Sequence, residues 1–152
     1  QVDSQVFDAL YRAGEIELEL VPQGNLAERI RAAGAGIAAF YTPTGYGTQL
    51  AAGKVTREID RRHYVLEYPI RADYALIKAE CADRWGNLVY RKTARNLGPM
   101  MASAARTTIV HVRRLVPLGS LDPEHIVTPG IFVKPVVRID PAHHAARAQA
   151  EA

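Results

Sequence analysis

The chain has 152 residues and a single cysteine, Cys81, so it fits one domain that buries an ordinary core without disulfides or a structural metal. Its net charge of +3 comes from 19 basic and 16 acidic residues that are interspersed, without the aromatic platforms of a single-strand binder. No apolar run is long enough to span a bilayer. We therefore expect neither nucleic acid nor membrane as a partner, and the lone cysteine favours the cytoplasm.

The first expected elements are a helix, a strand and a second helix. An amphipathic pattern predicts the first helix at about residues 4–13. Residues 15–20 alternate charged and apolar side chains, which predicts a strand over 15–21. Apolar residues then recur at helical spacing over 25–33.

The corner between this strand and the second helix is a candidate site, because it displays the amide of Gln23. Asn25 is a good N-cap with Glu28 three residues on, and Gly34 suits the C-terminal cap. Backbone N–H groups at a helix start carry partial positive charge and can receive a carboxylate or an oxyanion. A well-capped corner without a ligand is the alternative interpretation.

A glycine-containing loop and a hairpin follow. A short strand is expected at 37–41, and the loop 42–48 holds two glycines, a proline and three threonines, so its backbone can take positive φ and approach a ligand closely. An ordinary turn-rich connection is as consistent with this composition. Residues 63–68 are expected to pair with 55–59 across a turn at 60–61.

The second half of the chain contains further strands and one helix. Residues 74–79 are nearly all apolar, which is typical of a strand covered on both faces in the sheet centre. Turn formers at 83–87 precede a return strand at 88–90. A helix rich in small residues at 100–105 leads into a buried strand at 107–112.

The carboxyl-terminal region is expected to hold one more strand and a tail. The strand at 131–137 should lie at a sheet edge, because Pro135 cannot donate to a ladder. We interpret residues 1–139 as one domain and 140–152 as a frayed or disordered tail. The alternation of strands and helices predicts an α/β fold with helices on the faces of the sheet.

General catalytic motifs are absent from the chain. Cys81 at the end of an apolar strand is interpreted as a small structural hydrophobe. The histidines show no metal-ligand spacing, so no metal site is expected; His111 fits a core or interface residue and the pair His143–His144 a part of the tail.

Four segments carry a family resemblance: residues 21–30 (VPQGNLAERI), 40–48 (FYTPTGYGT), 83–96 (DRWGNLVYRKTARN) and 121–133 (LDPEHIVTPGIFV). They resemble the A subunit of the 3-oxoacid CoA-transferases in the right order and nearly end to end. The resemblance implies a three-layer α/β/α sandwich with a mostly parallel sheet and hairpin additions, in each of two related subunits.

The resemblance also implies a reaction and partners. The family moves CoA from succinyl-CoA to a 3-oxo acid by ping-pong chemistry, with CoA present as a substrate thioester and no further cofactor. The nucleophilic glutamate lies in the B subunit within a Ser-Glu-Asn-Gly motif that this chain lacks. A heterodimer or heterotetramer with the B subunit is therefore expected.

Site residues follow from the same resemblance. Gln23, with Gly24 and Asn25 behind it, is similar to the family glutamine that faces the reacting carbonyl. The loop residues Gly45, Tyr46, Gly47 and Thr48 match the loop beside the acyl group or the subunit contact. Arg95 and Asn96 are further candidates, since an arginine suits a substrate carboxylate.

This chain also departs from the family pattern. The usual amino-terminal Gly-Gly-Phe-Gly region is missing, Arg61 replaces a turn glycine, Leu97 replaces a phenylalanine, and residues 111–114 replace a more acidic stretch. Three interpretations stay open: a subunit that uses 3-oxoadipate as the CoA acceptor, one that uses acetoacetate, and a binding module or structural remnant without chemistry.

Overall fold

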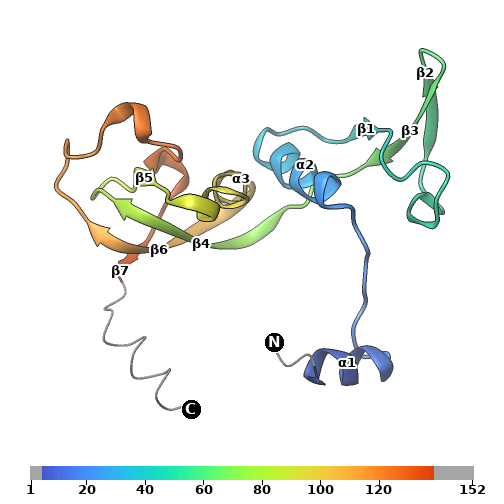
Figure 1. Ribbon diagram of the computed structural model, residues 1–152, viewed down its shortest axis with the longest axis horizontal. Helices are drawn as coiled ribbons and strands as arrows, with labels where there is room; N and C mark the ends of the chain where they lie inside the picture. The colour runs from blue at the N-terminus through green and yellow to red at the C-terminus, as the bar shows by residue number, and fades with distance from the viewer. Residues whose placement is uncertain (1–4, 139–152) are drawn as a thin grey trace.

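The computed structural model describes residues 5–138 and contains two β-sheets with two helices between them (Figure 1). The amino-terminal helix α1 (Gln5–Arg12) confirms the expected helix and lies apart from both sheets at the end of a long connection. It buries none of its residues, although its apolar positions recur on one face.

The larger sheet has four strands in the order β5-β4-β6-β7. Strand β4 (Ala72–Ala82) pairs in parallel with β6 (Ala105–Leu115), which pairs in parallel with β7 (Val136–Arg138). Strand β5 (Leu88–Val89) adds an antiparallel hairpin partner to the end of β4. The α/β class and a mostly parallel sheet with a hairpin addition are therefore confirmed.

The smaller sheet is antiparallel, in the order β1-β3-β2. Strand β3 (Arg62–Glu67) lies between β1 (Phe40–Thr42) and β2 (Thr56–Ile59). The β2–β3 turn is the predicted one, and both Asp60 and Arg61 have positive φ, 50° and 60°. That geometry is the hairpin turn whose twist matches the flanking strands.

The helices α2 (Gln23–Gly34) and α3 (Gly98–Ala104) pack against each other between the sheets. Gly34 belongs to this contact, since a Cβ there would clash with the Ser103 side chain. The prediction that Gly34 caps α2 was wrong. Ala35 follows the last helical residue, and the residue with the left-handed backbone conformation is Gly36, with a φ of 72°.

The core lies under one face of the larger sheet. Ala75, Ile77, Val110 and Val112 are buried there against Ala102 of α3. Strand β4 lies between β5 and β6, but β5 pairs only with Cys81 and Ala82, so the expected central position of residues 74–79 is not confirmed in the described residues. Coverage on both faces is not confirmed either: the opposite face leaves Tyr74 and Leu76 67% and 72% exposed. Successive strand residues point to opposite sides of a sheet. In the described residues, helices cover only the side that carries Ala75 and Ile77, and the side that carries Tyr74 and Leu76 is open.

Two further expectations were wrong. Residues 15–21 form no strand, because no strand of the described residues pairs with them, and an alternating pattern alone supplies no hydrogen-bond partner. The strand expected at 131–137 is reduced to β7, because residues 130–132 form a 3₁₀ turn ahead of Pro135. The expected tail from residue 140 and its histidines fall outside the described residues.

Candidate functional site

The first turn of α2 presents Gln23 to solvent. Pro22 precedes the helix with an extended backbone (φ −54°, ψ 138°), and no side chain caps the helix start. Gln23 and Gly24 are both exposed, and a Cβ on Gly24 would meet no atom within 4 Å. The first backbone N–H groups of a helix lack intrahelical acceptors, so this turn offers uncapped donors next to the Gln23 amide.

Asn25 is not the N-cap that the sequence predicted. It is the third helical residue, only 4% exposed, and its side-chain Nδ2 donates to Thr44 O and to Glu67 Oε1, each at 3.4 Å. The expected capping partner Glu28 binds Arg31 instead, at 2.6 and 2.9 Å. That hydrogen-bonded guanidinium lowers the pKa of Glu28 below its usual value of 4.5.

The loop after β1 has the backbone that its composition predicts. Gly45 and Gly47 have positive φ, 92° and 75°. The Thr48 hydroxyl donates to Gly45 O at 2.7 Å and accepts from Leu50 N at 3.2 Å. The Tyr46 ring stacks on His63 of β3, with centroids 4.6 Å apart, so the smaller sheet supports the loop.

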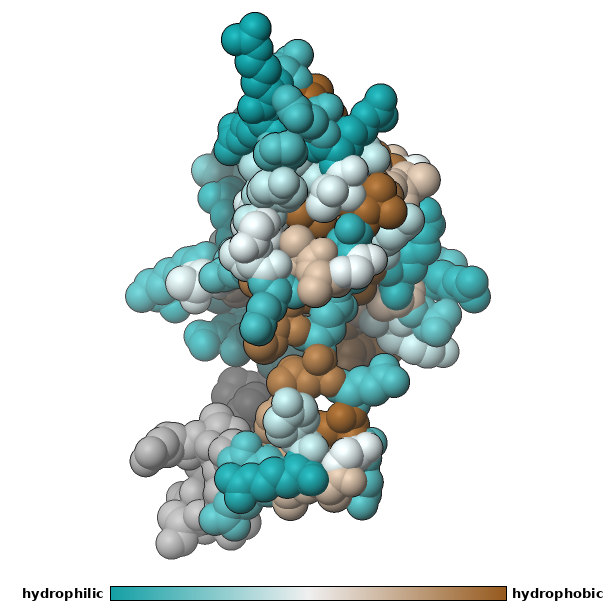
Figure 2. All heavy atoms as spheres, turned by 90° about the vertical axis from the view of Figure 1, so that its right-hand side faces the viewer, coloured by the Kyte–Doolittle hydropathy of each residue, from teal (hydrophilic) through white to brown (hydrophobic). Residues whose placement is uncertain are grey.

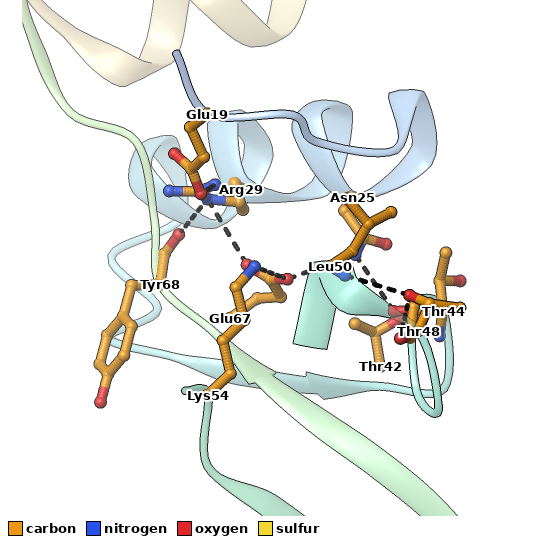
Figure 3. Close-up of polar contacts among 11 residues, drawn as sticks. Glu19, Asn25, Arg29, Thr42, Thr44, Thr48, Leu50, Lys54, Glu67 and Tyr68 are labelled. Atoms are coloured by element: carbon orange, nitrogen blue, oxygen red, sulfur yellow. Dashed lines mark hydrogen bonds and ion pairs between the residues drawn. The ribbon is translucent and has the colours of Figure 1, made fainter. Parts of the chain in front are cut away.

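The structure brings the helix start and this loop together. Asn25, two residues after Gln23, reaches Thr44, which immediately precedes Gly45 (Figure 3). Arg95 and Asn96 lie elsewhere, at the end of the 3₁₀ turn Lys92–Arg95 that packs against α3 and β4. Their backbone is tied locally, by Asn96 N to Thr93 O at 3.0 Å.

A buried carboxylate lies behind this corner, and it was not predicted from the sequence. Glu67, with a 4% exposed side chain, is 2.8 Å from Lys54 Nζ and 3.8 Å from Arg29 Nε. Figure 3 shows both cations and the Asn25 amide directed at this carboxylate from different segments. Only its position in the sequence could have revealed Glu67. It lies two residues after Val65, on the inward face of the strand, where an apolar residue is usual.

Other features of the described residues lie away from this corner. A groove of about 520 Å³ runs along β4 beside the segment 91–94 and is lined by the cations Lys78, Arg91, Lys92 and Arg113.

Residues 5–138 contain no group of three or more His, Cys, Asp or Glu side chains placed to hold a metal ion. None of the helices described is long and apolar enough to cross a membrane.

The end of the molecule that carries the smaller sheet has a mixed surface. Figure 2 shows hydrophobic side chains among hydrophilic ones on this side. Tyr46, Val55 and Tyr68 are among the exposed large hydrophobic residues of this region. Tyr46 belongs to the candidate loop, so an exposed aromatic ring lies at that loop.

Comparisons with known proteins agree with the fold and the motifs. The family model described as "Coenzyme A transferase" matches residues 1–138. The chain is 67% identical over 150 residues to the A subunit of 3-oxoadipate CoA-transferase from Pseudomonas putida, covering 99% of this chain and 65% of that protein. It is 57% identical over 135 residues to the A subunit of succinyl-CoA:3-ketoacid coenzyme A transferase from Xanthomonas campestris pv. campestris strain B100, covering 89% and 56%. The chain therefore spans less than two thirds of the length of these relatives.

Solved structures show the same fold at lower identity. An acyl-CoA transferase from E. coli O157:H7, in a thioester complex with CoA, superposes with a TM-score of 0.75 at 24% identity, covering 88% of this chain and 31% of that one. Glutaconate coenzyme A-transferase from Acidaminococcus fermentans gives a TM-score of 0.73 at 21% identity, covering 91% and 50%.

Proposed function

This chain belongs to the coenzyme A transferase family, and we propose that it is part of an A subunit that moves CoA from succinyl-CoA to 3-oxoadipate together with a B subunit. The name of the relative from Pseudomonas putida supports this acceptor. The proposal places the reaction in the cytoplasm and the chain in a heterodimer or heterotetramer.

One structural observation carries the proposal: Gln23 stands exposed at an uncapped helix start that is joined to the glycine loop. The side chain of Asn25 makes this connection by donating a hydrogen bond to the carbonyl of Thr44. An amide N–H donor and helix N–H groups at one corner can stabilise negative charge on a reacting carbonyl. The positive φ of Gly45 and Gly47 lets the loop backbone approach that group closely.

In the proposed mechanism the B subunit supplies the nucleophile. Its glutamate attacks the thioester carbonyl of succinyl-CoA, an acyl anhydride forms as the CoA thiolate leaves, and return of the thiolate gives a glutamyl-CoA thioester and succinate. Each attack passes through a tetrahedral oxyanion. The Gln23 side-chain amide donates a hydrogen bond to that oxygen, and the partial positive charge of the α2 start favours it further.

The remaining candidates have supporting roles. Gly45, Tyr46, Gly47 and Thr48 form the loop beside the acyl group, with Gly24 leaving space at the helix start. Arg95, with Asn96 next to it, is exposed and suits a substrate carboxylate. Both residues lie at the end of the 3₁₀ turn that packs against α3 and β4. In this proposal they therefore bind the substrate at a place separate from the Gln23 corner.

Acetoacetate is the alternative acceptor. The relative from Xanthomonas, at 57% identity, is named for a 3-ketoacid substrate. The two acceptors differ in a distal carboxylate, which 3-oxoadipate carries and acetoacetate lacks. A cationic side chain that meets this group would discriminate between them.

Substrate profiling of the complete heteromer tests the proposal. We expect succinyl-CoA to donate CoA to 3-oxoadipate with a kcat/KM at least about tenfold above that for acetoacetate. The two kinds of subunit, assayed separately, are the controls and should show no transfer. Equal or higher kcat/KM with acetoacetate would favour the alternative, and no transfer with either acceptor would contradict the CoA-transferase proposal.

A further inference from the structure

Glu67 is a buried charge at the end of β3 that the proposed chemistry does not use. Its side chain is only 4% exposed, in the middle strand of the smaller sheet. A buried carboxylate is tolerated only when cations and hydrogen-bond donors satisfy it. Lys54 Nζ donates to Oε1 at 2.8 Å, and Arg29 Nε lies 3.8 Å from Oε2.

The groups around Glu67 come from separate segments of the chain. Lys54 belongs to the connection between the glycine loop and β2, and Arg29 to the middle of α2. Arg29 is itself held by Glu19 at 2.8 Å and by Tyr68 O at 2.9 Å. Glu67 is therefore the junction at which α2, the loop connection and the smaller sheet are fixed to one another (Figure 3).

Asn25 extends this junction to the candidate site. Its Nδ2 contacts Glu67 Oε1 on one side and Thr44 O on the other, both at 3.4 Å. Asn25 lies in the first turn of α2 with Gln23, and Thr44 is next to Gly45. Through the Asn25 amide, the Glu67 carboxylate is therefore connected both to the first turn of α2 and to the glycine loop.

The geometry points to Glu67 as a positioning residue: through Asn25, and with Lys54 and Arg29 as counter-charges, it sets the first turn of α2 against the glycine loop. The effect on turnover rests on the proposed function, whereas the effect on the loop does not. A buried ion pair often adds little stability compared with apolar packing, and in some proteins such a pair is retained because it specifies one arrangement. A misplacement of about 1 Å at a catalytic corner can cost about 10²-fold in rate.

The first experiment replaces Glu67 by its neutral isostere in the complete heteromer. We expect Glu67→Gln to lower kcat about tenfold or more, with the KM for succinyl-CoA changed less than about twofold, since Glu67 does not touch substrate. Glu58→Gln, on the exposed strand β2 of the same sheet, is the matched control and should leave kcat unchanged.

A double-mutant cycle separates positioning from general stability. If Glu67 acts by placing Gln23, then Glu67→Gln should reduce kcat by less than about twofold in a Gln23→Ala background. A loss of equal size in both backgrounds would overturn the proposal, because the carboxylate would then act independently of Gln23.

Hydrogen exchange provides a readout that needs no activity. In the heteromer, well below its melting temperature, Glu67→Gln should speed amide exchange at Tyr46 and Thr48, whose N–H groups bond to Pro43 O and Gly45 O within the loop. Exchange in β4 and β6 should stay as in the parent. Unchanged loop exchange would contradict the proposal even if the reaction proves to be another one.

A second variant covers failure of Glu67→Gln to fold. Asn25→Ala keeps the Glu67–Lys54 pair and removes only the amide that joins it to the loop. It should reproduce faster exchange at Tyr46 and Thr48 and a kcat loss of about tenfold. If Asn25→Ala leaves both quantities at parent values, Glu67 serves the fold alone.

Discussion

Burial in the folded chain opposes the ionisation of Tyr90. It is partly buried after β5, and its hydroxyl lies 2.8 Å from Thr128 Oγ1, a side chain that is itself buried. Burial raises the pKa of Tyr90 above its ordinary value of 10.0, and the hydrogen bond to Thr128 opposes that shift only in part. The neutral phenol is therefore the form that the folded state favours.

Tyr90→Phe should cost about 1–2 kcal/mol of unfolding free energy at pH 7, because Thr128 loses its partner. The folded pKa is raised, so the contribution of Tyr90 to stability is complete below pH 10.0 and is lost as pH rises through the folded pKa. Urea unfolding at pH 7 and at about pH 10.5 should show a smaller decline with pH for the variant. An equal decline in both proteins would contradict this assignment.

At the scale of elements, the contact between α2 and α3 depends on Gly34. A Cβ there would clash with the Ser103 side chain, so Gly34→Ala should lower the unfolding free energy by about 1–2 kcal/mol despite the better helix propensity of alanine. Thermal unfolding should show recovery when Ser103→Gly is added. Gly24→Ala is the control, because open space surrounds Gly24; an equal effect of both alanines would argue against a packing cause.

The hairpin β2–β3 has a turn without glycine at a position that favours it. Arg61 has φ of 60°, where an L side chain is strained by about 1 kcal/mol. Arg61→Gly should raise the unfolding free energy by about that amount in thermal unfolding. Arg57→Gly, within β2, should instead lower it, since glycine weakens a strand interior. Destabilisation by Arg61→Gly would contradict the turn geometry.

Local pattern predicted most elements because their signals are local. The helix α1, the hairpin turn and the α/β class follow from periodicity and turn residues, whereas the mostly parallel sheet was expected from the family resemblance. Asn25 shows the limit: its sequence context fits an N-cap, yet its amide contacts Thr44 and Glu67, which lie 19 and 42 residues away. Partners at that separation leave no mark in a window of a few residues.

The missed and mistaken predictions share this physical cause. Residues 15–21 alternate like a strand, but a strand also needs a paired neighbour, which no period reveals. The apolar run in β4 predicted a central strand covered on both faces, but an apolar run does not reveal which strands and helices will lie beside it. Glu67 was detectable only as a charged residue at an inward position of β3, and its counter-ions Arg29 and Lys54 come from other segments.

At the scale of the whole molecule, the larger sheet exposes apolar side chains and a strand edge. Tyr74 and Leu76 lie on its open face, and β4 pairs with β5 only at Cys81 and Ala82, so within the described residues much of that edge has no neighbour. Unpaired strand edges and exposed apolar patches favour association.

The polypeptide of residues 1–152 should therefore associate as its concentration rises. Leu76→Lys should shift this association to higher concentration, because it places a charge beside the exposed edge. Sedimentation velocity over a concentration series measures the effect. Leu20→Lys is the control, since Leu20 is similarly exposed, at 68%, but outside both sheets. Equal behaviour of the two variants would contradict association through the sheet.

The central claim is that Gln23 stabilises the oxyanion in a CoA transfer completed by a partner chain, and turnover of the heteromer carrying Gln23→Ala tests it most directly. We expect kcat to fall about 10²-fold to 10³-fold, the usual effect of losing one oxyanion donor. The melting temperature should stay close to that of the parent, because Gln23 is exposed and contributes little packing. Turnover within about threefold of the parent would contradict the claim and leave this corner a structural one.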